Sequence, residues 1–379
     1  MFDIAVMGGG LAGSALAIML CKANFNVVIL DKGDSPNFHL PETALLDDTT
    51  ILSMLGLSSE ELASVLDTEM RTSFCNSDHS QEITIAHRFK SSQKGLTRVN
   101  RIGLDHLLLR KAVKAGAIYK SGADIQFVNI GNDSSSLVYK ELGECKTLTA
   151  KYIIDATGKA ALLANLLELK EAEQVLSGRQ LIFTHFENAE FRKQLDDKTI
   201  YITDIQQGHV FVIPLSAARF SIGAVIQHPA LIKPKQYEAV FNEALNEVSW
   251  IQKTMPDMSR KLPYIKAQNE SFICKHFSTK NYLIAGEATG FRDPFYSNGI
   301  ITTLAMITPA FNTVVKLLNA SNETHTICQD YNSEINNIIT DLEKQPAQWL
   351  QNHSLKVKSH SQRDPHIPYG ITHFLTAVS

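Results

Sequence analysis

The sequence predicts an α/β protein, α+β overall, in which a domain of parallel strands carries an inserted antiparallel sheet. Two patterns support this fold class. Residues 2–30 contain a short apolar strand, a glycine-rich turn, a helix of small residues and a second strand rich in β-branched residues, which together form a βαβ unit. Residues 180–226 contain four short alternating runs without a long helix, which is typical of an antiparallel sheet.

Composition limits the classes of protein to consider. The chain has 379 residues, of which 44% are hydrophobic and 20% charged, as in a globular enzyme with a large core. A net charge of −3 argues against a dedicated nucleic-acid binder. The five cysteines show no C-x-x-C spacing, so neither a disulfide framework nor a metal site is predicted. The absence of a signal-peptide pattern and of an obvious transmembrane run predicts a cytoplasmic protein.

The order of these elements predicts a discontinuous domain arrangement. Residues 1–70, 96–170 and 278–325 are expected to form the domain that contains the βαβ unit. Residues 71–95 and 171–277 are expected to form the antiparallel domain, which would bind the substrate. Residues 326–379 are expected to form a C-terminal helix and tail.

The first glycine-rich turn predicts a dinucleotide site. Gly8, Gly10 and Gly13 satisfy G-x-G-x-x-G after a strand and before a helix, and Asp31 ends the next strand. Gly8 allows the tight turn, Gly10 lets the backbone approach a pyrophosphate, and Gly13 lets the helix pack on the strand. Asp31 would accept hydrogen bonds from ribose hydroxyls, which disfavours a 2′-phosphate. Ala12 and Lys32 are included in the predicted site because they adjoin these residues.

A second glycine-rich segment identifies the dinucleotide. An apolar strand ending at Ala285 leads into residues 286–290 (Gly-Glu-Ala-Thr-Gly) and then residues 293–299. This segment resembles the second FAD motif of the flavoprotein monooxygenase and halogenase superfamily, in which Gly-Asp-Ala-x-Gly precedes an Asp-Pro loop. Glu287 replaces the usual aspartate. The matching residues are Gly286, Glu287, Ala288, Gly290, Asp293, Pro294, Ser297, Asn298 and Gly299.

The resemblance has several consequences for fold and cofactor. It implies a Rossmann-like FAD-binding domain with an inserted substrate domain, as in the aromatic hydroxylases. Glu287 would contact the ribityl chain of FAD, and residues 293–299 would run along the isoalloxazine ring. Arg101, which precedes a helix, would reach the phosphates or the ribityl chain. Asp155 and Gly158 resemble the Asp-Ala-x-Gly strand end that touches the adenosine half.

The substrate chemistry is less well defined than the cofactor. Residues 41–43 resemble the Glu loop of flavin-dependent halogenases, and residues 209–214 occupy the place of their Trp-x-Trp-x-Ile-Pro motif without either tryptophan. The halogenase active-site lysine should follow the Glu loop, yet the chain has no lysine between Gly33 and Phe89. This disfavours a halogenase. Hydroxylation through a flavin C4a-hydroperoxide fits better, with Glu42, His209 and Tyr296 as candidate catalytic residues.

A halogenase-like flavoprotein without the lysine resembles the maturation flavoproteins of cysteine tryptophylquinone oxidases, such as lysine ε-oxidase and glycine oxidase. The resemblance implies an FAD monooxygenase that hydroxylates a tryptophan in a precursor oxidase, so the partner would be a protein substrate. The alternatives are a hydroxylase of a small aromatic or secondary metabolite and a non-catalytic flavoprotein chaperone. No nucleic acid is expected as a partner, and reducing equivalents would come from a transiently bound nicotinamide or from external reduced flavin.

Overall fold

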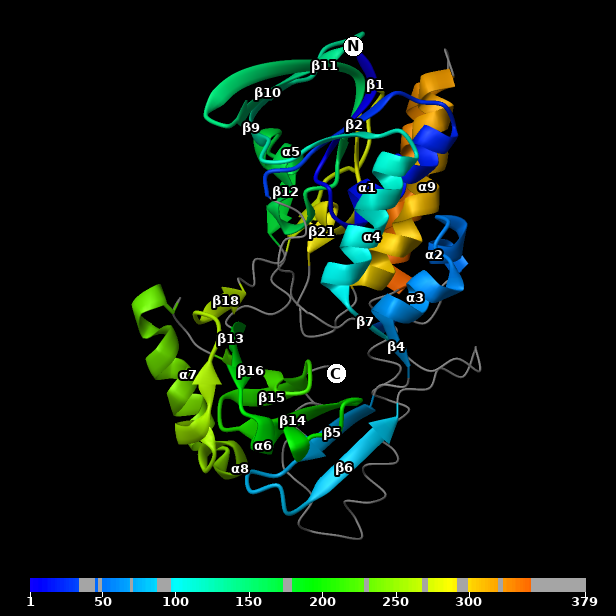
Figure 1. Ribbon diagram of the computed structural model, residues 1–379. Coiled ribbons are helices and arrows are strands. Elements are labelled where there is room, and N and C mark those ends of the chain that lie inside the picture. Colours follow the sequence, from blue (N-terminus) through cyan, green and yellow to red (C-terminus); the bar gives the residue numbers. More distant parts are fainter. Residues whose placement is uncertain are drawn as a thin grey trace. The chain divides into compact units, whose positions relative to one another are not determined.

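The computed structural model describes residues 1–33, 45–46, 50–68, 71–86, 97–172, 179–227, 232–267, 272–291, 299–319 and 323–341. The chain divides into two compact units (Figure 1). Unit 1 comprises Met1–Asp67, Thr97–Gln174 and Glu270–Glu343. Unit 2 comprises Thr68–Leu96, Val175–Asn269 and Lys344–Ser379. The predicted α/β fold class is confirmed, since both parallel and antiparallel sheets are present.

Unit 1 is built on a sheet with strand order β8-β2-β1-β11-β10-β9, in which β20 also pairs with β11. Strands β8, β2, β1, β11 and β20 are parallel; β2, β20 and the ends of β1 and β11 are buried because helices cover this part of the sheet, whereas the edge strand β8 is partly exposed. The first half of β11 continues as an antiparallel hairpin with β10. The strands are β1 (Phe2–Met7), β2 (Val27–Leu30), β8 (Ile118–Lys120), β9 (Asp124–Asn129), β10 (Ser135–Glu141), β11 (Glu144–Asp155) and β20 (Tyr282–Ile284).

Three long helices pack together in unit 1, namely α1 (Leu11–Lys22), α4 (Arg101–Lys114) and α9 (Gly299–Asn319) (Figure 1). Helix α9 is long and apolar enough to cross a membrane by length and composition, with 21 residues and a mean hydropathy of 1.4. The expectation that no run reaches transmembrane length therefore overlooked this helix. Its apolar side is used inside the unit, because Ile300, Ile307 and Val314 are buried in the same core as α1.

Residues 324–341 form a further helix that belongs to unit 1. The Tyr331 hydroxyl donates a hydrogen bond to the Ile284 carbonyl at 3.0 Å, and the Phe277 N–H donates to Asn332 Oδ1 at 2.8 Å. The sequence placed residues 326–341 in a separate C-terminal segment. The structure places them against β20 instead, because Tyr331 is an interior residue of this core.

Short elements complete unit 1. The first turn of α3 is held by a capping box, in which Ser58 Oγ accepts from the Glu61 N–H and the Glu61 carboxylate accepts from the Ser58 N–H. Two small sheets have the orders β3-β7-β4 and β12-β19-β21. The remaining elements are β3 (Leu45–Leu46), α2 (Thr50–Met54), α3 (Ser59–Val65), β4 (Leu66–Thr68), β7 (Thr97–Val99), η1 (Gly158–Ala160), α5 (Leu162–Leu166), β12 (Lys170–Ala172), β19 (Phe272–Cys274), η4 (Gly286–Ala288) and β21 (Gly290–Phe291).

Unit 2 contains a sheet with strand order β17-β13-β16-β15-β14-β5-β6, in which β18 also pairs with β13. All its pairs are antiparallel except β14 with β5. Alternation puts Phe186, Phe220 and Ile222 on one face, where they pack with Phe191 and Phe241 of the helices. The elements are β5 (Arg71–Cys75), β6 (Glu82–Ala86), β13 (Arg179–Glu187), α6 (Ala189–Lys193), β14 (Thr199–Ile205), β15 (Gly208–Pro214), β16 (Arg219–Gln227), η2 (Pro234–Gln236), α7 (Tyr237–Asn246), α8 (Ser249–Gln252), η3 (Met255–Asp257), β17 (Ser259–Arg260) and β18 (Ile265–Ala267).

Candidate functional site

The glycine-rich turn of unit 1 is packed so closely that two of its glycines have no room for a side chain. A Cβ on Gly13 would lie 1.9 Å from the Gly8 carbonyl oxygen, and a Cβ on Gly8 would lie 2.4 Å from the Ala156 carbonyl oxygen. Gly8 also has a φ of 99°, which L-residues with side chains rarely adopt. These contacts bring the start of α1 directly onto β1 and beside the 155–158 segment.

Gly10 differs from its neighbours because it borders open space. It is the N-cap of α1, its backbone is extended, and no side chain caps the helix there. Among the described residues, no heavy atom outside the turn lies within 4 Å of a Cβ built on Gly10. The first N–H groups of a helix are free and carry a partial positive charge of about half a unit. This cradle suits the phosphates of a dinucleotide.

Asp31 is bound to the glycine-rich turn. Its Oδ2 accepts the Gly9 N–H at 2.8 Å and its Oδ1 accepts the Gly33 N–H at 3.1 Å. The side chain is mostly buried. The sequence analysis predicted the position of Asp31 beside the turn but missed Gly9, because the G-x-G-x-x-G template treats that position as variable. The backbone N–H of Gly9 holds the Asp31 carboxylate against the turn.

The second glycine-rich segment meets the first within unit 1. Gly286 has a φ of 64°, and a Cβ there would lie 2.9 Å from the Ala12 Cβ. A Cβ on Gly299 would lie 2.3 Å from Glu287 Oε1, and a Cβ on Gly158 would lie 4.0 Å from Glu287 Oε2. Four segments that are distant in sequence therefore converge around the Glu287 carboxylate and the start of α1.

Asp155 organises one of these segments from the interior. Its side chain is fully buried and accepts hydrogen bonds from the Thr157 N–H, the Thr157 hydroxyl and the Leu163 N–H at 2.6–2.9 Å. Burial raises the pKa of this carboxyl, and the hydrogen bonds oppose the rise. The predicted contact between Asp155 and the cofactor does not fit this placement, because the residue has no exposed surface. Asp155 acts by holding the loop that contains Gly158.

Two predicted cationic residues are placed very differently. Arg101 is buried at the start of α4, where its guanidinium lies 3.3 Å from the Asp105 carboxylate, and its Nε has no hydrogen-bond partner among the described residues. A buried donor of this kind suits an anionic group such as a phosphate. Lys32 instead forms an exposed ion pair with Asp124 at 3.1 Å. Its ammonium is therefore occupied at the surface.

Some predicted site residues lie outside the described part of the chain. These are Glu42, Asp293, Pro294, Tyr296, Ser297 and Asn298. Gly290 is described and lies in β21, where a Cβ would come 3.0 Å from the Phe272 carbonyl oxygen. Because Gly290 has no side chain, β19 can approach β21 closely.

The second face of the unit 2 sheet carries a row of apolar residues. Phe183, Gly223, Phe211, Ile202 and Phe74 lie directly opposite one another on five strands. The Phe211 ring lies over Gly223, where a Cβ would come 2.1 Å from the ring. His209, predicted as a candidate catalytic residue, lies on this face two residues from Phe211 on β15, where it is buried. The cross-strand row was missed because pairing register is not visible in one strand.

The comparisons with known proteins identify the family. The model of the family described as FAD binding domain matches residues 1–345. The 1H-pyrrole-2-carbonyl-[peptidyl-carrier protein] chlorinase of Pseudomonas fluorescens is 24% identical over 365 residues, which are 89% of this chain and 80% of that protein. The tryptophan 2-halogenase of Chondromyces crocatus is 24% identical over 307 residues, which are 78% of this chain and 58% of that protein.

A solved structure shows the same fold. The flavin-dependent halogenase CmlS superposes with a TM-score of 0.75 at 20% sequence identity, covering 89% of this chain and 62% of that chain. The chain thus spans less than two thirds of the length of CmlS and of the tryptophan 2-halogenase.

These similarities correct the predicted function. The hydroxylation of a tryptophan in a precursor protein is wrong, because the relatives found along most of the chain are halogenases. The finer resemblance to maturation flavoproteins of tryptophylquinone oxidases has no support among them. The absence of a lysine between Gly33 and Phe89 does not separate this chain from the halogenases in overall sequence similarity.

The prediction of FAD as the cofactor is confirmed by the family match. The convergent glycine segments of unit 1, with Gly10 bordering open space and the buried Nε of Arg101, fit a bound dinucleotide. The chain belongs to the FAD binding domain family and is a flavin-dependent oxidoreductase.

Proposed function

We propose that this protein is a flavin-dependent halogenase that acts on an electron-rich aromatic ring. The observation that carries the proposal is the similarity over 89% of the chain to a pyrrole chlorinase, together with the similarity to a tryptophan halogenase. Pyrrole and indole rings share a high electron density, so they react with electrophilic halogen. An electron-rich ring is therefore the substrate class common to both relatives.

Unit 1 would hold the cofactor for this reaction. The α1 N-terminus at Gly10 would bind the pyrophosphate, Asp31 would accept from the ribose, and Glu287 would hydrogen-bond the ribityl hydroxyls. FAD, once bound and reduced, supplies the two electrons that activate dioxygen for halide oxidation. The protein contributes by fixing the cofactor through rigid glycine turns, so that little reorganisation accompanies the reaction.

Unit 2 would supply the substrate surface. Phe211, Phe183 and Phe74 lie on one face of its sheet, beside His209 on β15, and among them Phe211 is the partly exposed residue that would contact a bound ring. Aromatic side chains in offset or edge contact stabilise a bound ring by about 0.5–1.5 kcal/mol per pair. Polar groups on such an apolar surface would orient the ring.

A lysine is the group that the halogenase resemblance requires. The first lysine after Gly33 in the sequence is Lys90, followed by Lys94, and both lie outside the described residues. Lys90 is the first ammonium group after the stretch in which the halogenase lysine is expected, so its substitution tests whether it transfers the halogen. Lys94 serves as a matched control for the loss of a positive charge in the same segment.

The test is product analysis with and without halide. The purified protein is supplied with FAD, a flavin reductase, NADH, dioxygen and bromide. The acceptors are pyrrole-2-carboxylate, tryptophan and monochlorodimedone, a general acceptor of hypohalous acid. We expect a brominated product with the isotope doublet of bromine in its mass spectrum, and we expect Lys90→Met to abolish it while Lys94→Met retains it.

Other products would contradict the proposal. Addition of oxygen to the ring, at the same rate with and without bromide, would identify a hydroxylase. Consumption of reduced flavin and dioxygen with hydrogen peroxide as the only product, and no halogenation of any acceptor, would show that halide is not oxidised. Activity in Lys90→Met equal to that of the unsubstituted protein would overturn only the role of Lys90.

A further inference from the structure

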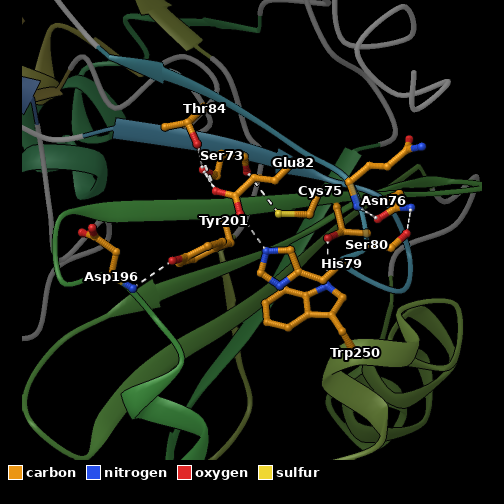
Figure 2. Close-up of polar contacts among 12 residues, drawn as sticks. Ser73, Cys75, Asn76, His79, Ser80, Glu82, Thr84, Asp196, Tyr201 and Trp250 are labelled. Carbon is orange, nitrogen blue, oxygen red and sulfur yellow. Dashed lines mark hydrogen bonds and ion pairs between the residues drawn. The ribbon is translucent and has the colours of Figure 1, made fainter. Parts of the chain in front are cut away.

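Three side chains of different chemistry converge at the edge of the unit 2 sheet. Cys75 ends β5, Glu82 begins β6, and His79 lies in the turn between them (Figure 2). Their Sγ, imidazole nitrogen and carboxylate oxygen atoms all lie within 4.8 Å of one another. His79 Nε2 and Glu82 Oε2 are 3.0 Å apart. Thiolate, imidazole and carboxylate are the three ligand types that proteins offer to Zn²⁺.

The turn that connects the two strands fixes the position of His79. Its backbone has a φ of 59°, in the left-handed region that residues with side chains rarely adopt. Asn76 holds the turn, because its carbonyl accepts from the His79 N–H at 3.1 Å and its Oδ1 accepts from the Gln81 N–H at 3.0 Å. The imidazole is thereby directed back over the sheet toward Cys75 and Glu82 (Figure 2).

Neighbouring groups hold the other two sides of the cluster. The second carboxylate oxygen of Glu82 accepts hydrogen bonds from the hydroxyls of Ser73 and Thr84. The His79 ring packs on the Trp250 indole, with ring centroids 4.7 Å apart. The backbone N–H of Trp250 donates to the Ser77 carbonyl at 3.2 Å, so α8 is attached to the same turn. Groups that orient the ligands in this way are typical of metal sites in proteins.

A nucleophilic cysteine is the other use for a Cys-His-Glu group, and the surroundings argue against it. Cys75 is buried, and its thiol donates weakly to the Ser73 carbonyl at 3.9 Å rather than facing a base at hydrogen-bonding distance. Burial and the nearby Glu82 raise the pKa of this thiol to about 12. A reactive cysteine needs positive charge or a hydrogen-bonded base in the protein to favour the thiolate, whereas a bound metal ion would itself supply the positive charge that deprotonates a coordinating thiol.

We propose that Cys75, His79 and Glu82 bind one Zn²⁺ ion in unit 2, with water from the solvent side as the fourth ligand. Ligands placed about 2.0–2.3 Å from a zinc ion lie about 3.3–3.8 Å from one another, so small side-chain rotations complete the geometry. His79 and Glu82 are partly exposed, which gives the ion and its water a path to the site. Zinc is preferred over Mg²⁺ and Ca²⁺, which favour oxygen ligands.

The ion would link strands β5 and β6 beside the turn that connects them. Strand β6 is the last strand of its sheet and pairs only with β5 among the described strands. Edge hairpins depend on their turn for register. A bound ion would therefore fix the register of β6 and stabilise unit 2 without taking part in flavin chemistry.

The test is metal binding by the chelator-treated holoprotein. We expect one Zn²⁺ per chain by calorimetric titration with zinc chloride. Titration with cobalt chloride should give the thiolate-to-cobalt charge-transfer absorption that reports a cysteine ligand. Both Cys75→Ser and His79→Asn should weaken Zn²⁺ binding at least about tenfold, since even groups that only orient a metal ligand typically contribute that much. Asparagine tolerates the positive φ at position 79, so this variant should keep the fold.

Matched controls make the outcome decisive. Cys145→Ser and His106→Asn remove an exposed cysteine and an exposed histidine elsewhere and should leave Zn²⁺ binding unchanged. Near-ultraviolet circular dichroism and FAD content report whether each variant is folded. The proposal is overturned if the cobalt protein lacks thiolate absorption, or if folded His79→Asn binds Zn²⁺ with the affinity of the unsubstituted protein.

Discussion

The carboxylate of Glu287 occupies the space that a side chain at position 299 would fill, with 2.3 Å between Oε1 and a Cβ built on Gly299. Glutamate is one methylene longer than the aspartate of the resembling motif, and the glycine accommodates the extra length. We therefore expect Gly299→Ala to displace the carboxylate and weaken FAD binding by about tenfold, the loss of roughly one hydrogen bond to a charged group.

A second substitution distinguishes this explanation from a general disturbance of α9. Aspartate at position 287 leaves room for alanine at 299, so the double variant Glu287→Asp/Gly299→Ala should bind FAD more tightly than Gly299→Ala alone. Flavin fluorescence titration of the apoprotein measures each affinity. The steric relationship would be contradicted if the double variant lost as much FAD-binding free energy as the two single variants lose together.

Gly13 and Gly10 should respond in opposite ways to the same small change. Gly13→Ala places a methyl group against the backbone of Gly8 and should destabilise the apoprotein by about 1–3 kcal/mol, because α1 must move away from β1. Gly10→Ala meets open space among the described residues and should leave the apoprotein's stability within about 0.5 kcal/mol.

Gly10→Ala should affect FAD affinity although it leaves the stability of the apoprotein unchanged. If the open space is where the pyrophosphate lies, a methyl group there should weaken FAD binding at least about tenfold despite the unchanged fold. Urea unfolding of apoprotein and flavin titration give the two quantities. Gly10→Ala protein with normal FAD affinity would show that the phosphates lie elsewhere.

The Phe211 ring and Gly223 should be energetically coupled. An aromatic ring that covers a glycine on the neighbouring strand compensates for the missing side chain. We expect Gly223→Ala to destabilise unit 2 by about 1–2 kcal/mol in the presence of Phe211 and by much less in a Phe211→Ala background. Urea unfolding of the four proteins measures the coupling. A coupling free energy near zero would mean that the ring moves aside without cost.

The ion pair between β1 and β11 predicts a pH-dependent stability. The hydrogen bond from Lys151 at 2.8 Å, aided by the Asn26 N–H, lowers the pKa of Asp3 below its ordinary value of 3.8. The stabilisation is therefore present above pH 3.8 and is lost as the pH falls through the lowered value. Because both side chains are partly exposed, we expect Asp3→Asn to cost only about 0.5 kcal/mol at pH 7.

The measurement is the difference in urea midpoint between Asp3→Asn and the unsubstituted protein from pH 7 to pH 3.5. This difference should narrow toward the acid end of the range. In a Lys151→Met background, the difference in urea midpoint caused by Asp3→Asn should be much smaller at pH 7, because the lowered pKa of Asp3 depends mainly on that lysine. A difference that is constant over the whole range would assign the effect to something other than ionisation of Asp3.

The cofactor site was predictable because its signals are local in the sequence. Gly8, Gly13 and Asp31 stand at fixed spacing around one strand, one turn and one helix; Gly8 is required by its positive φ, and Gly13 by its contact with the Gly8 backbone in the same turn. The four strands between residues 180 and 226 were predicted within about two residues of their ends for the same reason, since alternation marks each strand separately.

The missed features depend on contacts between distant segments. Asp155 carries the same motif whether it faces a ligand or the interior, and only the positions of Thr157 and Leu163 determine which. The proximity of Cys75, His79 and Glu82 could not be read from their spacing, because these residues come from the ends of two strands and the turn between them. The apolar length of helix α9 was underestimated because threonines and a proline interrupt its apolar residues.

The order of strands in unit 1 determines when the cofactor can first bind during synthesis. Strand β1 leaves the ribosome first, but its neighbour β11 ends at Asp155 and the Glu287 segment follows β20 at Tyr282–Ile284. Strand β1 has both of its neighbours, β2 and β11, once Asp155 has been made, but β11 has no partner on its other side until Tyr282–Ile284 follows. Between these segments, unit 2 has already emerged almost completely. Unit 2 can thus fold before β20 and the Glu287 segment of unit 1 are made, so completion of the flavin site is a late step of assembly.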